Sequence, residues 1–416
     1  MKIGLGVQIL CSENVALSNN RKKGTMKVNK QRKSLLMNVL VGCVALVILI
    51  GSVCVYRHMK KRHEEEWANL QTNQQDKSGE HATDIPRLKT VVDTHEPVYR
   101  KIDRYLDKEK FNGSIAIFDK GHLKMNKGYG FQNIESGKTN DSNTLFLIGS
   151  AQKFFTGIML KKLEVEGKVH INAPVTQYLP KFKTKRPITL KDLMLHQSGL
   201  YKYEGAKNRV NLDEAVAAIQ KKGINRKYYH KHFYNDANYL VLAKVIEKVT
   251  QQSYTENYYK HFGKPLNLKH SAFFNDVRYQ EDMAKGYKLK KNVPVYSQPL
   301  FLDQYYGAGN LYMSTHDMGL VVRSLQMNRM FPEKVTQPYI HEIMTSRYPE
   351  NYRYGFYAFP GYNRINGVFY GQTFTTYFND RYIVVIATNY ENHKQNLVEN
   401  KMKHIYFNML KQPKTR

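Results

Sequence analysis

Ser150 and Lys153 lie three residues apart in the stretch "GSAQKFF", at the start of a segment whose apolar spacing predicts a helix over residues 150–166. Residues three apart on a helix are neighbours on its surface, so these two side chains can meet. Serine becomes an effective nucleophile when a base takes its proton, and lysine can do this only when it is neutral. A place in the first helical turn and burial both favour the neutral amine. The pair is therefore a candidate nucleophile and general base, and a free backbone N–H at the helix start could face an oxyanion.

The same spacing also has a simpler explanation. Ser150 could cap the helix and Lys153 could be a solvated surface residue. Short motifs of this kind occur often by chance. The spacing alone therefore leaves both interpretations open.

The elements that must position this pair are mixed. Apolar runs on both sides of Asp119-Lys120-Gly121 predict a β-hairpin, and residues 211–223 and 235–252 predict amphipathic helices. Near the C-terminus, "RYGFYAFPG", "INGVFYGQTFTTYF" and "RYIVVIATN" predict strands with a turn at 378–382, followed by a helix over 396–412. This order indicates an α+β domain with an antiparallel sheet of N- and C-terminal strands, flanked by helices, around an all-helical insertion.

Four regions are predicted along the chain. Residues 1–34 are a basic, cytoplasmic N-terminus, in which Met26 is an alternative start. Residues 35–56 are apolar over 22 positions, long enough to cross a bilayer at about 1.5 Å per residue, so we expect an uncleaved transmembrane helix in preference to a cleaved signal. Residues 57–90 predict a polar linker and 91–416 the catalytic domain.

The composition limits the partners of that domain. Residues 86–416 hold 51 Lys and Arg against 28 Asp and Glu, a net charge of +23, which attracts polyanions such as nucleic acid, anionic lipid or a phosphate-rich polymer. No nucleic-acid-binding motif is recognisable, and the membrane segment argues against nucleic acid. The three cysteines all precede residue 55. With no HExxH-type cluster and no phosphate-binding glycine loop, we expect no metal and no cofactor.

Four ordered motifs provide the context for Ser150. "KDLMLHQSGLYKY" (191–203), "YND" (234–236), "YYGAGNLYMSTHDMG" (305–319) and "INGVFYGQTF" (365–374) follow the "SAQK" segment. Together they resemble the serine β-lactamase and penicillin-binding protein superfamily, in particular its class C and esterase branch. The resemblance covers residues 96–410 and implies that superfamily's α+β fold. It is closest to the teichoic acid D-alanine esterases in that branch, including their single N-terminal membrane segment.

The resemblance implies a role for each matching residue. Ser150 would be the acylated nucleophile, Lys153 its base and Tyr234 a proton relay to the leaving group. Asp236 stands where the superfamily carries Asn, and we favour a functional role for it over helix capping. His196 is expected to hold the loop before Gly199 rather than to act in catalysis.

The oxyanion and substrate contacts would come from Asn366, Gly367 and Val368, with the backbone N–H of Val368 acting beside that of Ser150. Ile365 stands where the superfamily has a Lys or His that helps to hold a peptide carboxylate. A D-alanyl ester has a free ammonium there instead, which Asp236 could bind. Both departures favour an aminoacyl ester over a stem peptide as substrate.

The expected function is hydrolysis of D-alanyl esters on teichoic acids, at the outer face of the cell membrane of a Gram-positive cell. Weak acylation by β-lactams is a further implication of the resemblance. Two alternatives stay open: a low-affinity penicillin-binding DD-peptidase, and a non-catalytic protein that binds wall polymers. An intact Ser150, Lys153 and Tyr234 set argues against the latter, and Ile365 argues against the peptidase.

Overall fold

The structure, a computed structural model, describes residues 85–291, 293–391 and 397–411, which belong to one compact unit, Ile85–Arg416. The predicted α+β class is confirmed. The predicted membrane segment, residues 35–56, lies outside the described residues. Among the helices that the structure does describe, none has the length and apolar character needed to span a membrane.

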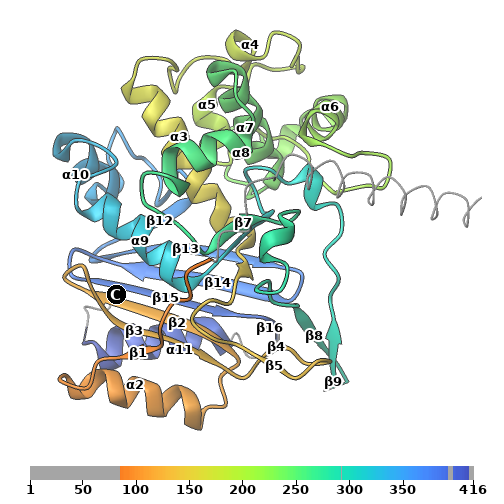
Figure 1. Cartoon of the computed structure of the whole chain (residues 1–416). Coiled ribbons are helices and arrows are strands. Elements are labelled where there is room, and N and C mark those ends of the chain that lie inside the picture. The colour runs from red at the N-terminus through yellow and green to blue at the C-terminus, as the bar shows by residue number, and fades with distance from the viewer. Residues whose placement is uncertain (1–84, 292, 392–396, 412–416) are drawn as a thin grey trace, which may run out of the picture. The chain divides into compact units, whose positions relative to one another are not determined.

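An eight-stranded antiparallel sheet is the centre of the fold (Figure 1). Its strands follow the spatial order β1-β3-β2-β15-β14-β13-β12-β11, so N- and C-terminal strands share one sheet as predicted. The strands are β1 (Val91–Val92), β3 (His122–Tyr129), β2 (Gly113–Asp119), β15 (Tyr382–Thr388), β14 (Gln372–Phe378), β13 (Tyr362–Phe369), β12 (Phe356–Phe359) and β11 (Tyr352–Arg353).

Tight turns join neighbouring strands of this sheet. The β2–β3 hairpin turns at Lys120-Gly121, where both residues have positive φ, as two-residue hairpin loops require. β14 and β15 are joined by the predicted turn after Phe378. The segment 365–378 contains a further turn at Tyr370-Gly371, so it forms parts of two strands, β13 and β14. The two predicted hairpins are therefore confirmed. A turn at Tyr354-Gly355 likewise divides the predicted strand 353–361, so that Arg353 of β11 pairs with Phe356 of β12.

Helices cover both faces of the sheet. They are α2 (Pro97–Lys108), α3 (Gln152–Val165), α4 (Val175–Tyr178), α5 (Leu190–Met194), α6 (Leu212–Lys222), α7 (Asp236–Thr250), α8 (Tyr254–Tyr258), α9 (Thr315–Gln326), α10 (Glu333–His341) and α11 (Leu397–Lys403). α3, α6 and α7 match the predicted helices. The predicted C-terminal helix divides into α11 and a π-helical turn, His404–Met409.

Alternate residues of the strands enter two separate apolar cores. Ile115 and Ile117 of β2 face the core that α2 and the C-terminal helix complete. Ala116 and Phe118 face the larger core, which contains α3, α7 and α9. Figure 1 shows α2 and α11 on one side of the sheet and α9, α3 and the helical region on the other. The candidate nucleophile therefore lies on the side of the larger core.

The insertion between the terminal strands is not all-helical, so this part of the prediction is wrong. It also holds the small sheet β6-β10-β7, a separate β4-β5 pair and the hairpin β8-β9, which β16 joins from beyond β15. Runs of two to four residues are too short to show the alternation that identifies a strand in a sequence. These strands are β4 (Phe131–Asn133), β5 (Lys138–Thr139), β6 (Phe146–Leu147), β7 (Ser271–Phe273), β8 (Tyr287–Lys290), β9 (Val293–Tyr296), β10 (Leu311–Met313) and β16 (Tyr390–Glu391).

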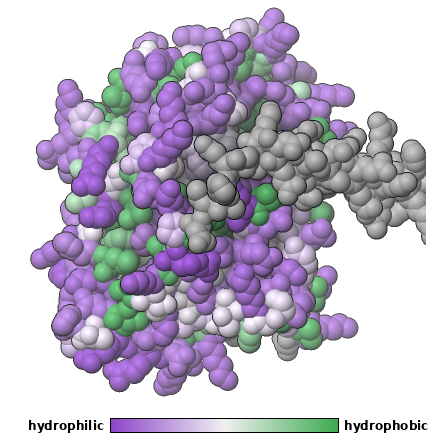
Figure 2. Space-filling model, viewed as in Figure 1, coloured by the Kyte–Doolittle hydropathy of each residue, from purple (hydrophilic) through white to green (hydrophobic). Residues whose placement is uncertain are grey.

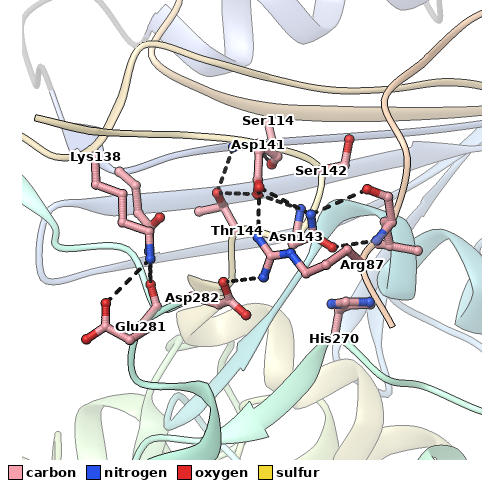
Figure 3. A network of polar contacts seen from close by, with 12 residues as sticks. Arg87, Ser114, Lys138, Asp141, Ser142, Asn143, Thr144, His270, Glu281 and Asp282 are labelled. Atoms are coloured by element: carbon pink, nitrogen blue, oxygen red, sulfur yellow. Dashed lines mark hydrogen bonds and ion pairs between the residues drawn. The ribbon is translucent and has the colours of Figure 1, made fainter. Parts of the chain in front are cut away.

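The first described residues are held against the domain by a polar network (Figure 3). The Arg87 guanidinium lies 2.7 Å from an Asp282 carboxylate oxygen and 2.9 Å from one of Asp141. The Leu88 N–H donates to the Asn143 amide oxygen at 2.6 Å. The described unit therefore begins at Ile85, inside the segment assigned to the linker.

Candidate active site

Ser150 and Lys153 meet at the start of α3, as their spacing predicts. Ser150 lies in the 3-10 turn Gly149–Ala151 that connects β6 to the helix. The Lys153 ammonium nitrogen, Nζ, lies 2.8 Å from the Ser150 hydroxyl oxygen. The start of α3 has no side-chain cap, and Lys153 is completely buried. The alternative of a helix cap beside a solvated lysine is therefore wrong.

Lys153 has a carboxylate partner, and this changes its expected protonation. Its Nζ also lies 2.6 Å from a carboxylate oxygen of Asp236 and 3.3 Å from the Ala308 carbonyl oxygen. Burial acts to lower the pKa of Lys153, but the contacts with Asp236 and, after it, Tyr234 outweigh burial and raise that pKa above its ordinary value. This direction favours an ammonium at rest, in contrast to the neutral amine that burial alone predicted.

Asp236 is the first residue of α7, and its neighbour Asn235 is the cap of that helix. The Asn235 amide oxygen accepts from the Ala237 N–H at 2.9 Å, while its amide nitrogen donates to the Leu200 carbonyl at 2.7 Å. Helix capping by Asp236 is therefore wrong, because Asn235 does this. The carboxylate of Asp236 is left to face Lys153, and it is about one-third exposed. The cation that pairs with Asp236 is therefore Lys153, where we had expected the ammonium group of a substrate.

Tyr234 lies next to this pair, packed against His196. Lys153 Nζ lies 5.2 Å from the centre of the Tyr234 ring, and the rings of Tyr234 and His196 are 4.3 Å apart. His196 is buried and accepts hydrogen bonds at Nδ1 from the Asn235 N–H and from the Asn238 amide. Its burial holds its pKa well below the usual range, so the ring is neutral. These contacts fit the positioning role expected for His196.

Strand β13 approaches the nucleophile where it carries a glycine. A Cβ atom on Gly367 would lie 1.9 Å from the Ile148 carbonyl oxygen and 2.8 Å from the Ser150 amide nitrogen. A side chain at position 367 would therefore force the strand away from Ser150. On the other side of the contact, a Cβ atom on Gly149 would lie 3.3 Å from the Val368 amide nitrogen. The amide nitrogens of Ser150 and Val368 thus lie beside the same turn, where an oxyanion site was predicted.

The main chain also approaches α3 from β11 and β12. A Cβ atom on Gly355 would lie 2.1 Å from the Lys153 carbonyl carbon, and one on Gly157 would lie 1.9 Å from the Tyr354 carbonyl oxygen. Real Cβ contacts are never so short. The helix that carries Ser150 and Lys153 is therefore packed directly on backbone atoms.

A hollow of about 310 Å³ opens at Ser150. Asn366 and Val368 line it, as predicted, and the Asn366 amide oxygen accepts from the Thr375 hydroxyl at 2.8 Å. Ile365 points to the opposite face of β13 and is buried. The complete lining is Ser150, Tyr234, Tyr352, Gly355, Tyr357, Arg364, Asn366 and Val368.

Sequence reasoning missed four residues of this lining: Arg364, Tyr352, Tyr357 and Gly355. Arg364 lies one position before Ile365, on the face of β13 that Asn366 and Val368 share, and is the cation nearest to the 365–374 motif in the sequence. Its guanidinium forms two hydrogen bonds with the Glu399 carboxylate, at 3.0 and 3.1 Å. The period of two along a strand could have indicated Arg364. Nothing in the sequence indicates its pairing with Glu399.

This arrangement is suited to acyl transfer. A serine hydroxyl, an ammonium, a carboxylate and a phenol surround one hollow, with two backbone N–H groups near the nucleophile. Across the described ranges, no three His, Cys, Asp or Glu side chains lie together as metal ligands would.

Comparison with known proteins agrees with the geometry. The family model described as "Beta-lactamase" matches residues 98–404. The chain belongs to the beta-lactamase family. The matched range includes every residue of the candidate site.

Two of the matches share about half of their residues with this chain, and a third shares the fold at much lower identity. The teichoic acid D-alanine hydrolase of Staphylococcus aureus is 49% identical over 396 residues, which cover 94% of this chain and 98% of that protein. The crystal structure of FmtA from Staphylococcus aureus is 54% identical, with a TM-score of 0.78, and the match covers 82% of this chain and 93% of that one. An octameric penicillin-binding protein homologue from Pyrococcus abyssi shares the fold at 23% identity, with a TM-score of 0.62 over 76% of this chain and 77% of its own.

Proposed function

We propose that this protein is a serine esterase that removes D-alanine from teichoic acids through an acyl-enzyme on Ser150. The observation that carries the proposal is the contact of Ser150 with the buried Lys153, in a chain 49% identical to a teichoic acid D-alanine hydrolase. A binding protein without activity would have no need of a buried ammonium at a serine, because removing a charge from water is costly even when the charge is paired, as Lys153 is with Asp236.

Acylation begins with proton transfer along the line from Ser150 through Lys153 to Asp236. Asp236 takes a proton from the Lys153 ammonium, and the resulting amine takes the proton of the Ser150 hydroxyl. The Ser150 oxygen then attacks the ester carbonyl, and the backbone N–H groups of Ser150 and Val368 stabilise the oxyanion. The C–O bond to the polyol breaks, and Tyr234 supplies the leaving oxygen with a proton. Water then hydrolyses the D-alanyl ester of Ser150 by the same steps in reverse.

Two features of the site favour an ester over a stem peptide. Ile365 is buried on the far face of β13, so it offers nothing to a peptide carboxylate. The nearby Arg364 is neutralised by Glu399, which limits its attraction for a carboxylate of the substrate. The choice of D-alanine as the acyl group rests on the relatives and not on Asp236, whose charge is paired with Lys153.

We further propose that the apolar segment 35–56 holds the protein in the cell membrane with its catalytic domain outside. The absence of cysteine after position 54 is compatible with an exported domain that needs no disulfide. Protease treatment of intact cells should degrade the catalytic domain. A domain that is digested only after lysis would contradict this location.

The direct test measures D-alanine release from purified D-alanylated teichoic acid by the full-length protein and by Ser150→Ala. We expect release by the wild type and none above background by the variant, because removing the nucleophile of a serine hydrolase costs many powers of ten in kcat. A labelled β-lactam and a peptide ending in D-Ala-D-Ala serve as comparison substrates. Cleavage of the peptide without release from the polymer would favour the DD-peptidase alternative.

A further inference from the structure

A strongly basic loop lies in the helical region, between α4 and α5. Residues 178–191 contain five Lys and Arg and no Asp or Glu. Lys181, Lys183, Lys185 and Arg186 are all exposed, and none of them pairs with a carboxylate of the described residues. Figure 2 shows that the upper part of this face, where Figure 1 places α4, α5 and α6, is predominantly hydrophilic. Four free cations on one short loop are available to an anionic ligand.

The loop surrounds a hollow of about 420 Å³. Polar and apolar groups alternate in its wall, including Lys183, Arg186, Thr176, Thr184, Phe182 and Ile188. Such a wall suits a unit that combines a phosphate with a carbon chain and hydroxyl groups, because each part finds a complementary surface.

A second basic loop is bound to the first. Residues 221–233 contain five Lys and Arg and no acidic residue, and Arg226, Lys227 and Lys231 are exposed. The Tyr229 hydroxyl donates to the Pro187 carbonyl at 2.7 Å, and the Arg186 guanidinium lies 5.1 Å from the centre of the Tyr229 ring. The two loops therefore form one continuous surface.

This surface leads to the active site through aromatic residues. Tyr228 stacks on Phe233 with ring centres 3.9 Å apart, and Lys202 lies 5.3 Å from the centre of the Phe233 ring. Phe233 directly precedes Tyr234, which lines the hollow at Ser150. The second basic loop thus continues directly into a residue that lines the hollow at Ser150.

Backbone hydrogen bonds fix the second loop against the segment 196–200. The Asn225, His230 and Phe233 N–H groups donate to carbonyl oxygens of that segment, each at 2.8 Å, with Gly199, Gln197 and His196 as the acceptors. A surface held in this way loses little conformational entropy when a ligand binds.

Few acidic groups oppose these cations. Asp192 is buried, accepts from the backbone N–H of Thr189 in the capping box of α5 and lies 3.3 Å from the His230 ring. Glu350 accepts from the Gln197 side chain at 3.0 Å, and Glu204 is exposed beside Lys202 in the nearby loop. Three carboxylates near eight cations leave the surface strongly positive.

We propose that these loops form an extended binding site for a phosphodiester-linked polyol chain, which holds the polymer while one of its esters lies at Ser150. We call this surface the basic track; its residues are Lys181, Lys183, Lys185, Arg186, Lys202, Arg226, Lys227 and Lys231. The inference rests on the proposed function and adds a binding site for the backbone of the substrate. Exposed cations attract a polyanion over about 10 Å at moderate ionic strength, and aromatic rings contact its carbon chain. We favour the substrate polymer over a membrane surface or a nucleic acid, because the second loop continues into the hollow at the nucleophile.

The test compares a track variant with a control of equal charge in the full-length protein. The track variant is K181Q/K183Q/K185Q/R186Q, and the control is R100Q/K101Q/R104Q/K108Q, whose residues are exposed on α2. Substrates are a D-alanylated polyglycerol phosphate polymer and the small ester D-alanine methyl ester. We expect the track variant to lose at least tenfold in kcat/KM on the polymer, through KM, and less than twofold on the methyl ester. The control should change less than twofold on both, and salt should inhibit the track variant less steeply than the wild type.

Two results would overturn the basic track. Equal losses of kcat/KM on the polymer in the track variant and the control would mean that the net charge of the protein, and not the position of these residues, governs polymer binding. Loss of binding to phosphatidylglycerol vesicles, with polymer hydrolysis unchanged, would assign the loops to a membrane surface. The proposed function fails separately, if the wild type releases D-alanine from neither substrate. In that case, direct binding of the polymer to the two variants still decides whether the track exists.

Discussion

The substitution Asp236→Asn tests the central electrostatic contact of the site. It replaces the carboxylate that lies 2.6 Å from Lys153 Nζ with an amide of almost the same shape. Two unit charges about 4 Å apart attract by about 4 kcal/mol at an effective dielectric constant of about 20. Because Asp236 is about one-third exposed, water screens part of this attraction. A remaining 2–3 kcal/mol corresponds to roughly a 30- to 150-fold change in the ratio of ammonium to amine at Lys153.

The sign of the pH effect follows from this contact. In the wild type the pKa of Lys153 is raised above 10.5, so the ammonium persists through the neutral range and Asp236 must take its proton during catalysis. In Asp236→Asn, burial is opposed by Tyr234 alone and lowers the pKa of Lys153. Lys153 then loses its proton at a lower pH, but no carboxylate is left to accept a proton from it during catalysis. We expect kcat near pH 7 to fall about 100-fold. We also expect a new rise of the rate with pH, because activity now depends on deprotonation of Lys153.

The assay measures kcat against pH for a D-alanyl ester and for an acetyl ester of the same alcohol. Because the lost contact lies within the protein, we expect equal factors of loss on both substrates. Asp213→Asn is the control, since Asp213 lies in the first turn of α6 and pairs with Lys244 on the surface. A loss confined to the D-alanyl ester would refute the reasoning. It would show instead that Asp236 binds the ammonium of the substrate.

Two other substitutions test how the site is held together. Gly367→Ala should abolish measurable acylation of Ser150 in an esterase assay and lower the free energy of unfolding by about 1–3 kcal/mol, because its Cβ has no space. Gly137→Ala is the control, since its Cβ would meet nothing within 4 Å; its positive φ of 72° should lower the stability in thermal unfolding, but the esterase activity should stay complete. Retained activity in Gly367→Ala would contradict the close contact. Asn235→Ala and Asn211→Ala each remove a helix cap and should each cost about 1–2 kcal/mol in urea unfolding, but only Asn235→Ala should also lower kcat, since Asn235 begins the helix that carries the partner of Lys153. Equal kcat in the two variants would show that the cap does not position the site.

The sequence predicted most of the elements because their signals are local. The helices α3, α6 and α7 have apolar residues at helical spacing, and the Lys120-Gly121 turn has a residue type that accepts positive φ. The small sheet of β6, β10 and β7 was missed because its pairing joins distant segments: Tyr312 of β10 pairs with Leu147, 165 residues earlier, and with Ala272, 40 residues earlier. Strands of two or three residues are stabilised by such pairing and not by their own composition.

The sequence brought the reactive residues of the site together, but it did not indicate how their charges are paired or which further residues line the hollow. Spacing on one helix brought Ser150 and Lys153 together, and the structure agrees. The protonation of Lys153 depends on Asp236, which is 83 residues away in the chain and reaches it only through the packing of α7 on α3. Arg364 was overlooked for a related reason, because its partner Glu399 comes from the last helix. Charges that are balanced across the fold cannot be assigned from a single stretch of sequence.

The glycine contacts around α3 separate two properties of this enzyme. Gly157, Gly355 and Gly367 place the nucleophile helix by main-chain packing, whereas Tyr352, Tyr357 and Val368 line the hollow at Ser150 with side chains. Substitutions in the lining can therefore alter which acyl group fits while the distance between serine and lysine stays the same. New substrate preferences can arise on this scaffold one side chain at a time, without loss of the reactive serine along the way.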